Sequence, residues 1–206
     1  MINADFSNSM RRRFSMIRFS DLFARVVWLL LIMSMRHAIP LEQNGSDSTK
    51  SLSWKTVITP KDEPGEPLIV SGTIYGPDGK TPLPGVTLYV YHTDAEGYYR
   101  KGTNSSSNPR LRGWMKTNTE GKYEFRTIKP GSYPGTRNPA HIHAKVRGAG
   151  YREQWSDEFH FEGDPFLSEQ EKQSEAGGGR FASIMAMQRD ANGVIRCVRD
   201  LKLERK

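Results

Sequence analysis

The fold class is decided by residues 85–91, which read GVTLYVY. Side chains two positions apart point to the same side of a β-strand, so Val86, Leu88 and Val90 share one face. The intervening positions place a threonine and two tyrosines on the other face. This alternation predicts a strand with one buried face and one face toward solvent or a ligand.

Similar segments lie on both sides of this stretch, at residues 68–75, 114–117, 122–128, 140–146 and 158–161. Turn-forming residues separate them, and the chain has 19 Gly and 12 Pro. Residues 184–188 and 194–203, joined by DANG at 190–193, predict a closing hairpin. No helix longer than about two turns is expected after the first 40 residues. The fold class predicted is therefore all-β, an antiparallel β-sandwich.

The 206 residues fit one domain with extensions. We assign residues 68–206 to the folded domain and residues 41–67 to a linker, in which residues 54–58 predict one short strand. Residues 1–40 read as a signal peptide or an N-terminal anchor, because arginines precede an apolar run at residues 26–33. That run is well short of the roughly 20 residues that span a bilayer. We expect a secreted or periplasmic protein with no stable membrane association after leader removal.

The net charge of +7 is unevenly distributed. The first 40 residues have six Arg and two Asp, which leaves +3 for the remainder of the chain. No run of basic residues with interleaved aromatics occurs there, so we predict no nucleic-acid surface. Cys197 is the single cysteine, which excludes an internal disulfide and a cysteine-based metal site.

Residues 141–143, His-Ile-His, lie within an alternating strand, so both imidazoles point to one side and could meet one metal ion. Two imidazoles are half of a site, and a histidine pair is often merely structural. Tyr99 and Tyr133 are candidate partners. Tyr99 follows the end of a strand, and Tyr133 lies in a loop because the prolines at 130 and 134 cannot continue a central strand. The fold therefore predicts a metal site built partly on loops.

Four blocks in order make the chain resemble the intradiol ring-cleavage dioxygenases, the family that contains protocatechuate 3,4-dioxygenase and catechol 1,2-dioxygenase. They are residues 72–100, ending DAEGYYR; residues 119–134, TEGKYEFRTIKPGSYP; residues 139–143, PAHIH; and residues 161–165, FEGDP. The resemblance extends over roughly residues 69–165.

The resemblance implies an iron(III) ion bound by Tyr99, Tyr133, His141 and His143. Iron(III) is a hard cation that favours phenolate oxygen, and it lowers the pKa of a bound phenol. The substrates implied are a small aromatic diol and O2, the product is a muconate-type diacid, and no organic cofactor is required. The family also implies that Tyr133 is displaced when the diol binds, which makes it a catalytic residue as well as a ligand.

Around these ligands the chain departs from the family pattern. The family has an arginine where Asn138 stands, so we take Asn138 and the adjacent Arg137 as candidate catalytic residues. Glu158 replaces an expected glutamine, and Gly135 replaces an aromatic residue that often follows Tyr-Pro. The helical dimerisation segment of catechol 1,2-dioxygenases is absent from the sequence. Whether the protein forms a homo-oligomer by other contacts is left open.

Two other interpretations compete with ring cleavage. The strands also resemble a transthyretin-like or carboxypeptidase-regulatory-like extracellular binding module without catalysis, in which the histidines are incidental. A cupin-like iron(II) site would use His141, His143 and a carboxylate such as Glu158. That site would leave Tyr99 and Tyr133 without a role.

Overall fold

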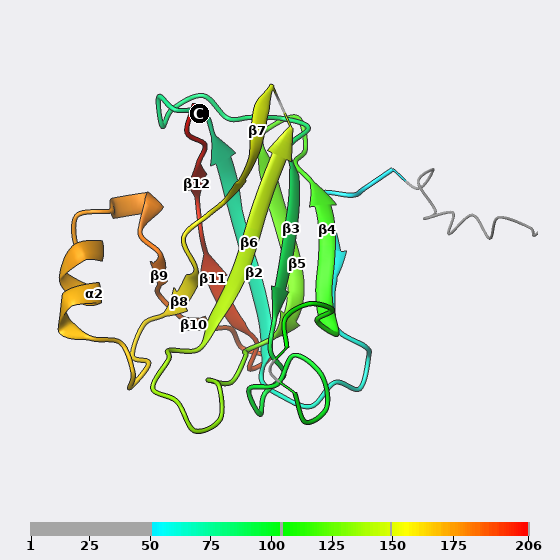
Figure 1. Ribbon diagram of the computed structural model, residues 1–206. Helices are drawn as coiled ribbons and strands as arrows, with labels where there is room; N and C mark the ends of the chain where they lie inside the picture. Colours follow the sequence, from blue (N-terminus) through cyan, green and yellow to red (C-terminus); the bar gives the residue numbers. More distant parts are fainter. Residues whose placement is uncertain (1–50, 104, 149, 206) are drawn as a thin grey trace, which may run out of the picture. The chain divides into compact units, whose positions relative to one another are not determined.

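The computed structural model describes residues 51–103, 105–148 and 150–205. They form two six-stranded sheets that lie face to face (Figure 1). The first sheet has the order β1-β5-β2-β11-β10, with β12 also paired to β2. Its strands are β1 (Lys55–Val57), β2 (Pro67–Tyr75), β5 (Lys122–Ile128), β10 (Gln188–Arg189), β11 (Ile195–Val198) and β12 (Leu201–Lys202).

The second sheet has the order β4-β3-β6-β8-β9, with β7 also paired to β6. Its strands are β3 (Thr87–His92), β4 (Leu111–Lys116), β6 (His141–Gly148), β7 (Tyr151–Trp155), β8 (Phe159–Phe161) and β9 (Ile184–Met185). Strand β3 lies between β4 and β6, with Tyr89 opposite Trp114 on one side and Tyr91 opposite His143 on the other. The order brings residues from distant parts of the sequence together on one outer face.

One hydrophobic core fills the space between the sheets. The second sheet contributes alternate residues such as Leu88, Val90 and Ile142, and the first sheet contributes Val70 and Phe125; all five are fully buried. The predicted alternation of β3 is therefore confirmed, and Tyr89 and Tyr91 lie on the outer face of the second sheet.

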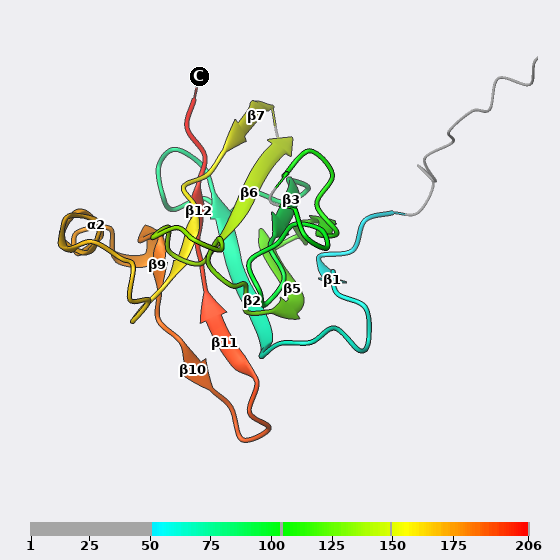
Figure 2. The same cartoon turned by 60° about the horizontal axis from the view of Figure 1, so that its bottom comes forward.

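The all-β sandwich is confirmed, but the sheets are mixed rather than purely antiparallel. Strand β1 pairs in parallel with β5, β11 and β12 pair in parallel with β2, and β8 pairs in parallel with β9. The predicted hairpin at residues 190–193 is present between β10 and β11, which are antiparallel (Figure 2). Strand β7 was not predicted.

The short strand expected at residues 54–58 is present as β1, and Ile58 is buried in the core. Part of the segment expected as a linker, residues 41–67, is thus built into the first sheet. The expected leader, residues 1–40, lies outside the described residues.

A helix, α2 (Glu169–Glu175), and a 3-10 turn, η1 (Gly179–Phe181), lie between β8 and β9. Ser168 and Glu171 form a capping box that starts α2. Among the described residues, no helix is long and apolar enough to cross a membrane.

Candidate metal centre

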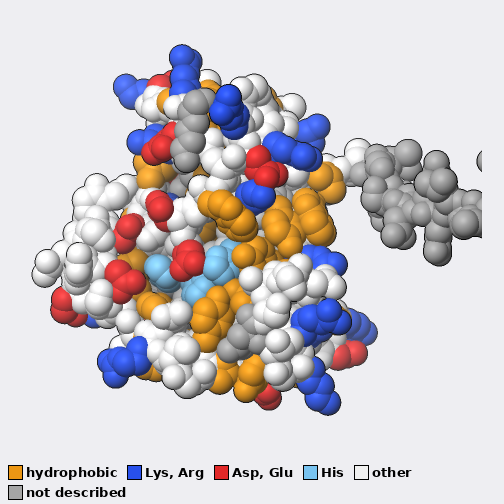
Figure 3. All heavy atoms as spheres, viewed as in Figure 1, with side chains coloured by type: hydrophobic (Ala, Val, Ile, Leu, Met, Phe, Trp, Pro, Cys, Tyr) orange, Lys and Arg blue, Asp and Glu red, His pale blue; other side chains and the backbone are white. Residues whose placement is uncertain are grey.

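Strand β6 presents the two histidines to the outer face of the second sheet. Ile142 and Ala144 point into the core, so His141 and His143 point the opposite way. The start of the strand is fixed by Asp164, whose Oδ2 accepts a hydrogen bond from the backbone N–H of Ala140 at 3.0 Å. In Figure 3, histidine side chains are visible in the middle of this face, beside hydrophobic ones.

Two loops bring the tyrosines over this face. Tyr99 follows a turn after β3, in which Asp94 Oδ1 accepts from the backbone N–H of Tyr98 at 2.9 Å. Tyr133 lies in the loop between β5 and β6. The loops contact each other directly, because the N–H of Gly131 donates to the carbonyl of Asp94 at 2.8 Å. Each tyrosine is therefore held partly by the other loop.

The four predicted residues converge on one point. The Oη atom of Tyr99 lies 2.7 Å from Nε2 of His143, and Oη of Tyr133 lies 3.0 Å from Nε2 of His141. The two Nε2 atoms lie 3.1 Å apart, Oη of Tyr133 lies 3.4 Å from Nε2 of His143, and the two hydroxyls contact each other. Four ligands around one ion with bonds of about 2.0 Å lie roughly 3.3 Å from one another in a tetrahedral arrangement. The cluster therefore fits a shared metal ion.

The histidines are oriented so that both Nε2 lone pairs face this point. Nδ1 of His141 lies 2.7 Å from the carbonyl oxygen of Pro139, which can only accept, so Nδ1 holds the proton. Nδ1 of His143 lies 3.2 Å from Oε1 of Glu158, so the same tautomer is favoured there. Ring nitrogens fixed in this way are typical of metal-binding histidines.

The protein environment alone keeps the phenols protonated. Burial, and then the hydrogen bond that Tyr99 donates to Tyr133, raise the pKa of the Tyr99 phenol far above its ordinary value. Burial also raises the pKa of Tyr133, and burial lowers the pKa of His141. A neutral imidazole is the form that binds metal, and a bound cation is what would ionise the phenols.

Glu158 and His160 adjoin the cluster. Oε2 of Glu158 lies 3.6 Å from Nε2 of His160, and hydrogen bonds with His143 and then His160 hold the pKa of Glu158 below its ordinary value. His141, Glu158 and His160 offer ligand atoms within 4.8 Å of one another. Glu158 faces Nδ1 of His143, on the other side of the ring from the phenols. The same Oε1 lies 3.8 Å from Nε2 of His141, so its shorter contact is the one with Nδ1 of His143, where it serves as a hydrogen-bond acceptor.

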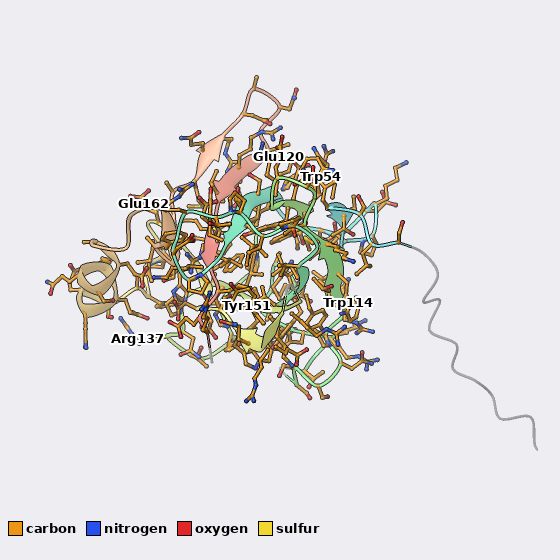
Figure 4. All side chains as sticks on the ribbon, turned by 90° about the horizontal axis from the view of Figure 1, so that it is seen from above. Trp54, Trp114, Glu120, Arg137, Tyr151 and Glu162 are labelled. Carbon is orange, nitrogen blue, oxygen red and sulfur yellow. The ribbon has the colours of Figure 1, made fainter. Side chains whose placement is uncertain are left out.

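The candidate catalytic residues Arg137 and Asn138 are not brought into the cluster. Both are exposed in the loop that follows Tyr133. The guanidinium of Arg137 lies 5.7 Å from the ring of Phe166, at the periphery of the domain (Figure 4). Within the described part of the chain, neither side chain contacts the four donor atoms.

Sequence reasoning missed three contributors to the site. These are the Pro139 carbonyl, His160, and Tyr91, whose ring stacks on His143 at a centroid distance of 4.6 Å. The position of Tyr91 on the outer face was available from the alternation of β3. The pairing of β3 with β6, which brings Tyr91 against His143, was not.

Comparisons with known proteins identify the family of the chain. Residues 44–199 match the sequence model of a dioxygenase family. Catechol 1,2-dioxygenase 1 of Acinetobacter lwoffii is 36% identical over 125 residues, which cover 52% of this chain and 39% of the relative. The protocatechuate 3,4-dioxygenase beta chain of Burkholderia cepacia is 30% identical over 114 residues, which cover 50% of this chain and 48% of the relative. The chain thus spans less than half the length of these curated relatives.

A solved structure is similar over more of its length. The dioxygenase domain of a dioxygenase carbohydrate-binding protein fusion from Streptomyces sp. SirexAA-E superimposes with a TM-score of 0.57 at 26% identity. The match covers 77% of this chain and 92% of that one. Fold and site define a β-sandwich with a cluster of two phenols and two imidazoles on an outer sheet face. The chain belongs to the intradiol ring-cleavage dioxygenase family.

Proposed function

We propose that the protein is an iron(III)-dependent intradiol dioxygenase that cleaves a catechol-type ring with O2 to a muconate-type diacid. The observation that supports this most is the convergence of two phenol oxygens and two imidazole nitrogens on one face of the sheet, where each atom lies within 3.4 Å of at least two of the others. The donor set suits a hard trivalent cation, because two phenolates would offset much of its charge.

The proposed ligands are Tyr99, Tyr133, His141 and His143. Iron(III) held there would supply a Lewis acid that draws electron density from a bound aromatic diol. Tyr99 is 3% exposed and serves as a fixed ligand, whereas Tyr133 is only half-buried, in a loop. We assign to Tyr133 the role of the ligand that leaves, its Oη accepting a proton from a substrate hydroxyl. The Pro139 carbonyl and Glu158 keep the two imidazoles in place while this happens.

The proposal is tested by reconstituting the purified protein with iron(III) and recording its visible spectrum. We expect a broad tyrosinate-to-iron charge-transfer band that shifts when catechol is added, and O2 uptake with catechol, protocatechuate or hydroxyquinol. Tyr99→Phe and Tyr133→Phe should each weaken the band, and Tyr151→Phe, outside the cluster, should not. A colourless reconstituted protein would refute the iron centre, and a coloured protein without O2 uptake would refute catalysis.

We also propose export from the cytoplasm, on the basis of the order of charge and hydropathy in residues 1–40. Expression of the full chain with a C-terminal tag tests it. Recovery of tagged protein, shortened at its N-terminus, outside the cytoplasmic fraction is the expected result, and a full-length cytoplasmic product would contradict it.

A further inference from the structure

An open groove of about 580 Å³ lies on the outer face of the second sheet. Its lining includes Tyr89 and Tyr91 of β3, Trp114 of β4, Trp155 of β7, and Lys145 and Arg147 of β6. The residues of β3, β4 and β6 face outward because the residues on either side of them in each strand point into the core. Trp155 of β7 is paired with Lys145 of β6 and lies on the same face. The groove is therefore a product of the same alternation that positions His141 and His143.

The groove adjoins the candidate metal centre through one residue. Tyr91 lines the groove, and its ring stacks on that of His143 with an interplanar angle of 21°. The ring of Tyr89 lies 5.6 Å from that of Tyr91 and 4.5 Å from that of Trp114. An unbroken row of aromatic rings thus leads from the surface to a proposed ligand.

The two tryptophans are unusually accessible for residues of their size. Trp114 is 48% exposed and Trp155 is 56% exposed. Single exposed apolar side chains need no explanation, but aromatic residues gathered around one hollow are typical of a binding site. Trp155 also forms a T-shaped pair with Tyr91, at a centroid distance of 6.2 Å, so Tyr91 contacts both Trp155 and Tyr89.

The surroundings of these rings are cationic. Lys145 pairs with Glu153, but Arg147 at the rim has no carboxylate partner among the described residues. A second hollow, of about 610 Å³, shares Trp114 and is lined by Arg100, Lys101 and Arg112. Within residues 51–205, apart from the undescribed positions 104 and 149, none of these three cations forms an ion pair with a carboxylate. A ligand that fits must therefore offer negative charge as well as flat apolar faces.

We propose that the groove is a distal subsite for a second aromatic ring bearing a carboxylate, in a substrate whose diol ring reaches the metal centre. This rests on the proposed function and names its substrate class. Aromatic rings of a ligand can stack on tryptophan and tyrosine, and a guanidinium such as that of Arg147 binds a carboxylate in the fork geometry. A neutral sugar would also stack on tryptophan, but it would leave the cations without a counterpart.

Binding without turnover tests the groove independently of catalysis. In calorimetric titrations, biphenyl-4-carboxylate, which has no diol, should bind the full-length protein. Trp114→Ala and Trp155→Ala should each weaken this binding about tenfold, a typical size for loss of aromatic stacking. Arg147→Gln should weaken it while leaving the binding of neutral 4-phenylbenzamide unchanged. Trp54→Phe, outside the groove, is the matched control and should change neither.

Turnover provides the second measurement. With 3′,4′-dihydroxybiphenyl-4-carboxylate, which joins a single diol ring to a benzoate, the tryptophan variants should lower the ratio of kcat/KM for this compound to that for catechol about tenfold. Equal binding of cellobiose and biphenyl-4-carboxylate would overturn the proposal in favour of a carbohydrate surface. Catechol cleavage with no binding of biphenyl-4-carboxylate would overturn the subsite alone, whereas binding with no cleavage of any diol would overturn the proposed function alone.

Discussion

At the scale of single residues, the two nitrogens of His143 have different tasks. Nε2 faces Tyr99 and the other donor atoms, and Nδ1 faces Glu158 at 3.2 Å. The carboxylate fixes both the tautomer and the plane of the ring, and it stands where the family pattern has a glutamine. A glutamine side-chain oxygen could accept the same hydrogen bond, but it would not bring a negative charge close to the cluster.

Glu158→Ala should reduce iron(III) affinity by roughly 10- to 100-fold, the usual effect of removing a partner of a metal-binding histidine. Glu158→Gln should retain most of the affinity, because it keeps an acceptor for Nδ1 of His143. Competition with a chelator, followed through the visible band, measures both. Glu153→Gln, which removes a carboxylate from the same sheet face, is the control; a loss as large as that of Glu158→Ala would show a general charge effect.

His92 predicts a dependence of stability on pH. It is fully buried, Nδ1 donates to the carbonyl of Thr93 at 2.6 Å, and burial lowers its pKa from 6.5 to about 4. The unfolded chain therefore binds a proton between pH 6.5 and 4 that the folded chain does not, so stability is lost as the pH falls through this window. The loss attributable to this group is about 3 kcal/mol at its lower end.

Urea unfolding of metal-free protein across this pH range measures the effect. His92→Gln retains a donor and an acceptor but cannot titrate, so its unfolding free energy should fall less steeply than that of the unchanged protein. Parallel curves for the two proteins would contradict the assignment to His92.

The four donor residues could be predicted from the sequence because the His-x-His spacing and the flanking blocks are local. Their supporting contacts could not. The Pro139 carbonyl reaches Nδ1 of His141 only because of the backbone path before β6, and Glu158 reaches His143 only because β8 lies beside β6. The same limit applies to Arg137, whose loop directs it toward Phe166. Its catalytic role, and that of Asn138, stay predictions.

At the scale of elements, the site depends on contact between two loops. Gly97, with φ of +89°, packs so closely against the loop of Tyr133 that a Cβ atom there would overlap the carbonyl oxygen of Ser132. Gly131 is similarly close to the carbonyl of Ala95. Glycines are required at these positions because the two backbones touch.

Gly97→Ala should therefore both destabilise the protein and weaken the visible iron band, since Tyr99 and Tyr133 would be moved apart. Gly102→Ala is the matched control, with φ of +72° and no atom within 4 Å of the added Cβ. It should cost about 1–2 kcal/mol of backbone strain and leave the band unchanged. Thermal unfolding and the spectrum measure the two effects, and equal behaviour of the variants would contradict the role of the loop contact.

Most strands could be predicted from alternation, whereas their partners could not. The period of two is a local property of a segment such as residues 85–91, and β3 begins and ends close to the expected positions. Parallel pairing joins segments far apart in sequence, such as β11 with β2. Strand β7 has a mostly exposed pattern, which gives little alternation to detect.

At the scale of the whole molecule, the folded domain begins before β2, because β1 and Ile58 already belong to it. Ile58 is 8% exposed and packs over Gly113 of β4, whereas the adjacent Val57 is 65% exposed. The polar and proline-rich composition of residues 41–67 concealed this contribution to the core. A strand of three residues is too short for its alternation to stand out.

Ile58→Ala should lower the free energy of unfolding by roughly 2–5 kcal/mol, because it leaves a cavity in the core. Val57→Ala removes a similar side chain from the surface and should change stability by less than about 0.5 kcal/mol. Chemical denaturation of both variants measures the two changes in the free energy of unfolding. A small effect of Ile58→Ala would mean that the segment before β2 is peripheral to the domain.

The parallel attachment of β11 and β12 to β2 has a consequence for biosynthesis. Asp200 Oδ1 accepts a hydrogen bond from the backbone N–H of Thr73, 127 positions earlier in the chain. During translation β2 can pair with β5 as soon as residues 122–128 are available, but its other edge stays unpaired until residues 195–202 have been made. Such distant pairings slow folding and leave an open strand edge in the meantime. The nascent chain thus exposes an unpaired strand edge between the synthesis of β5 and that of β11, and this edge is where a chaperone could bind.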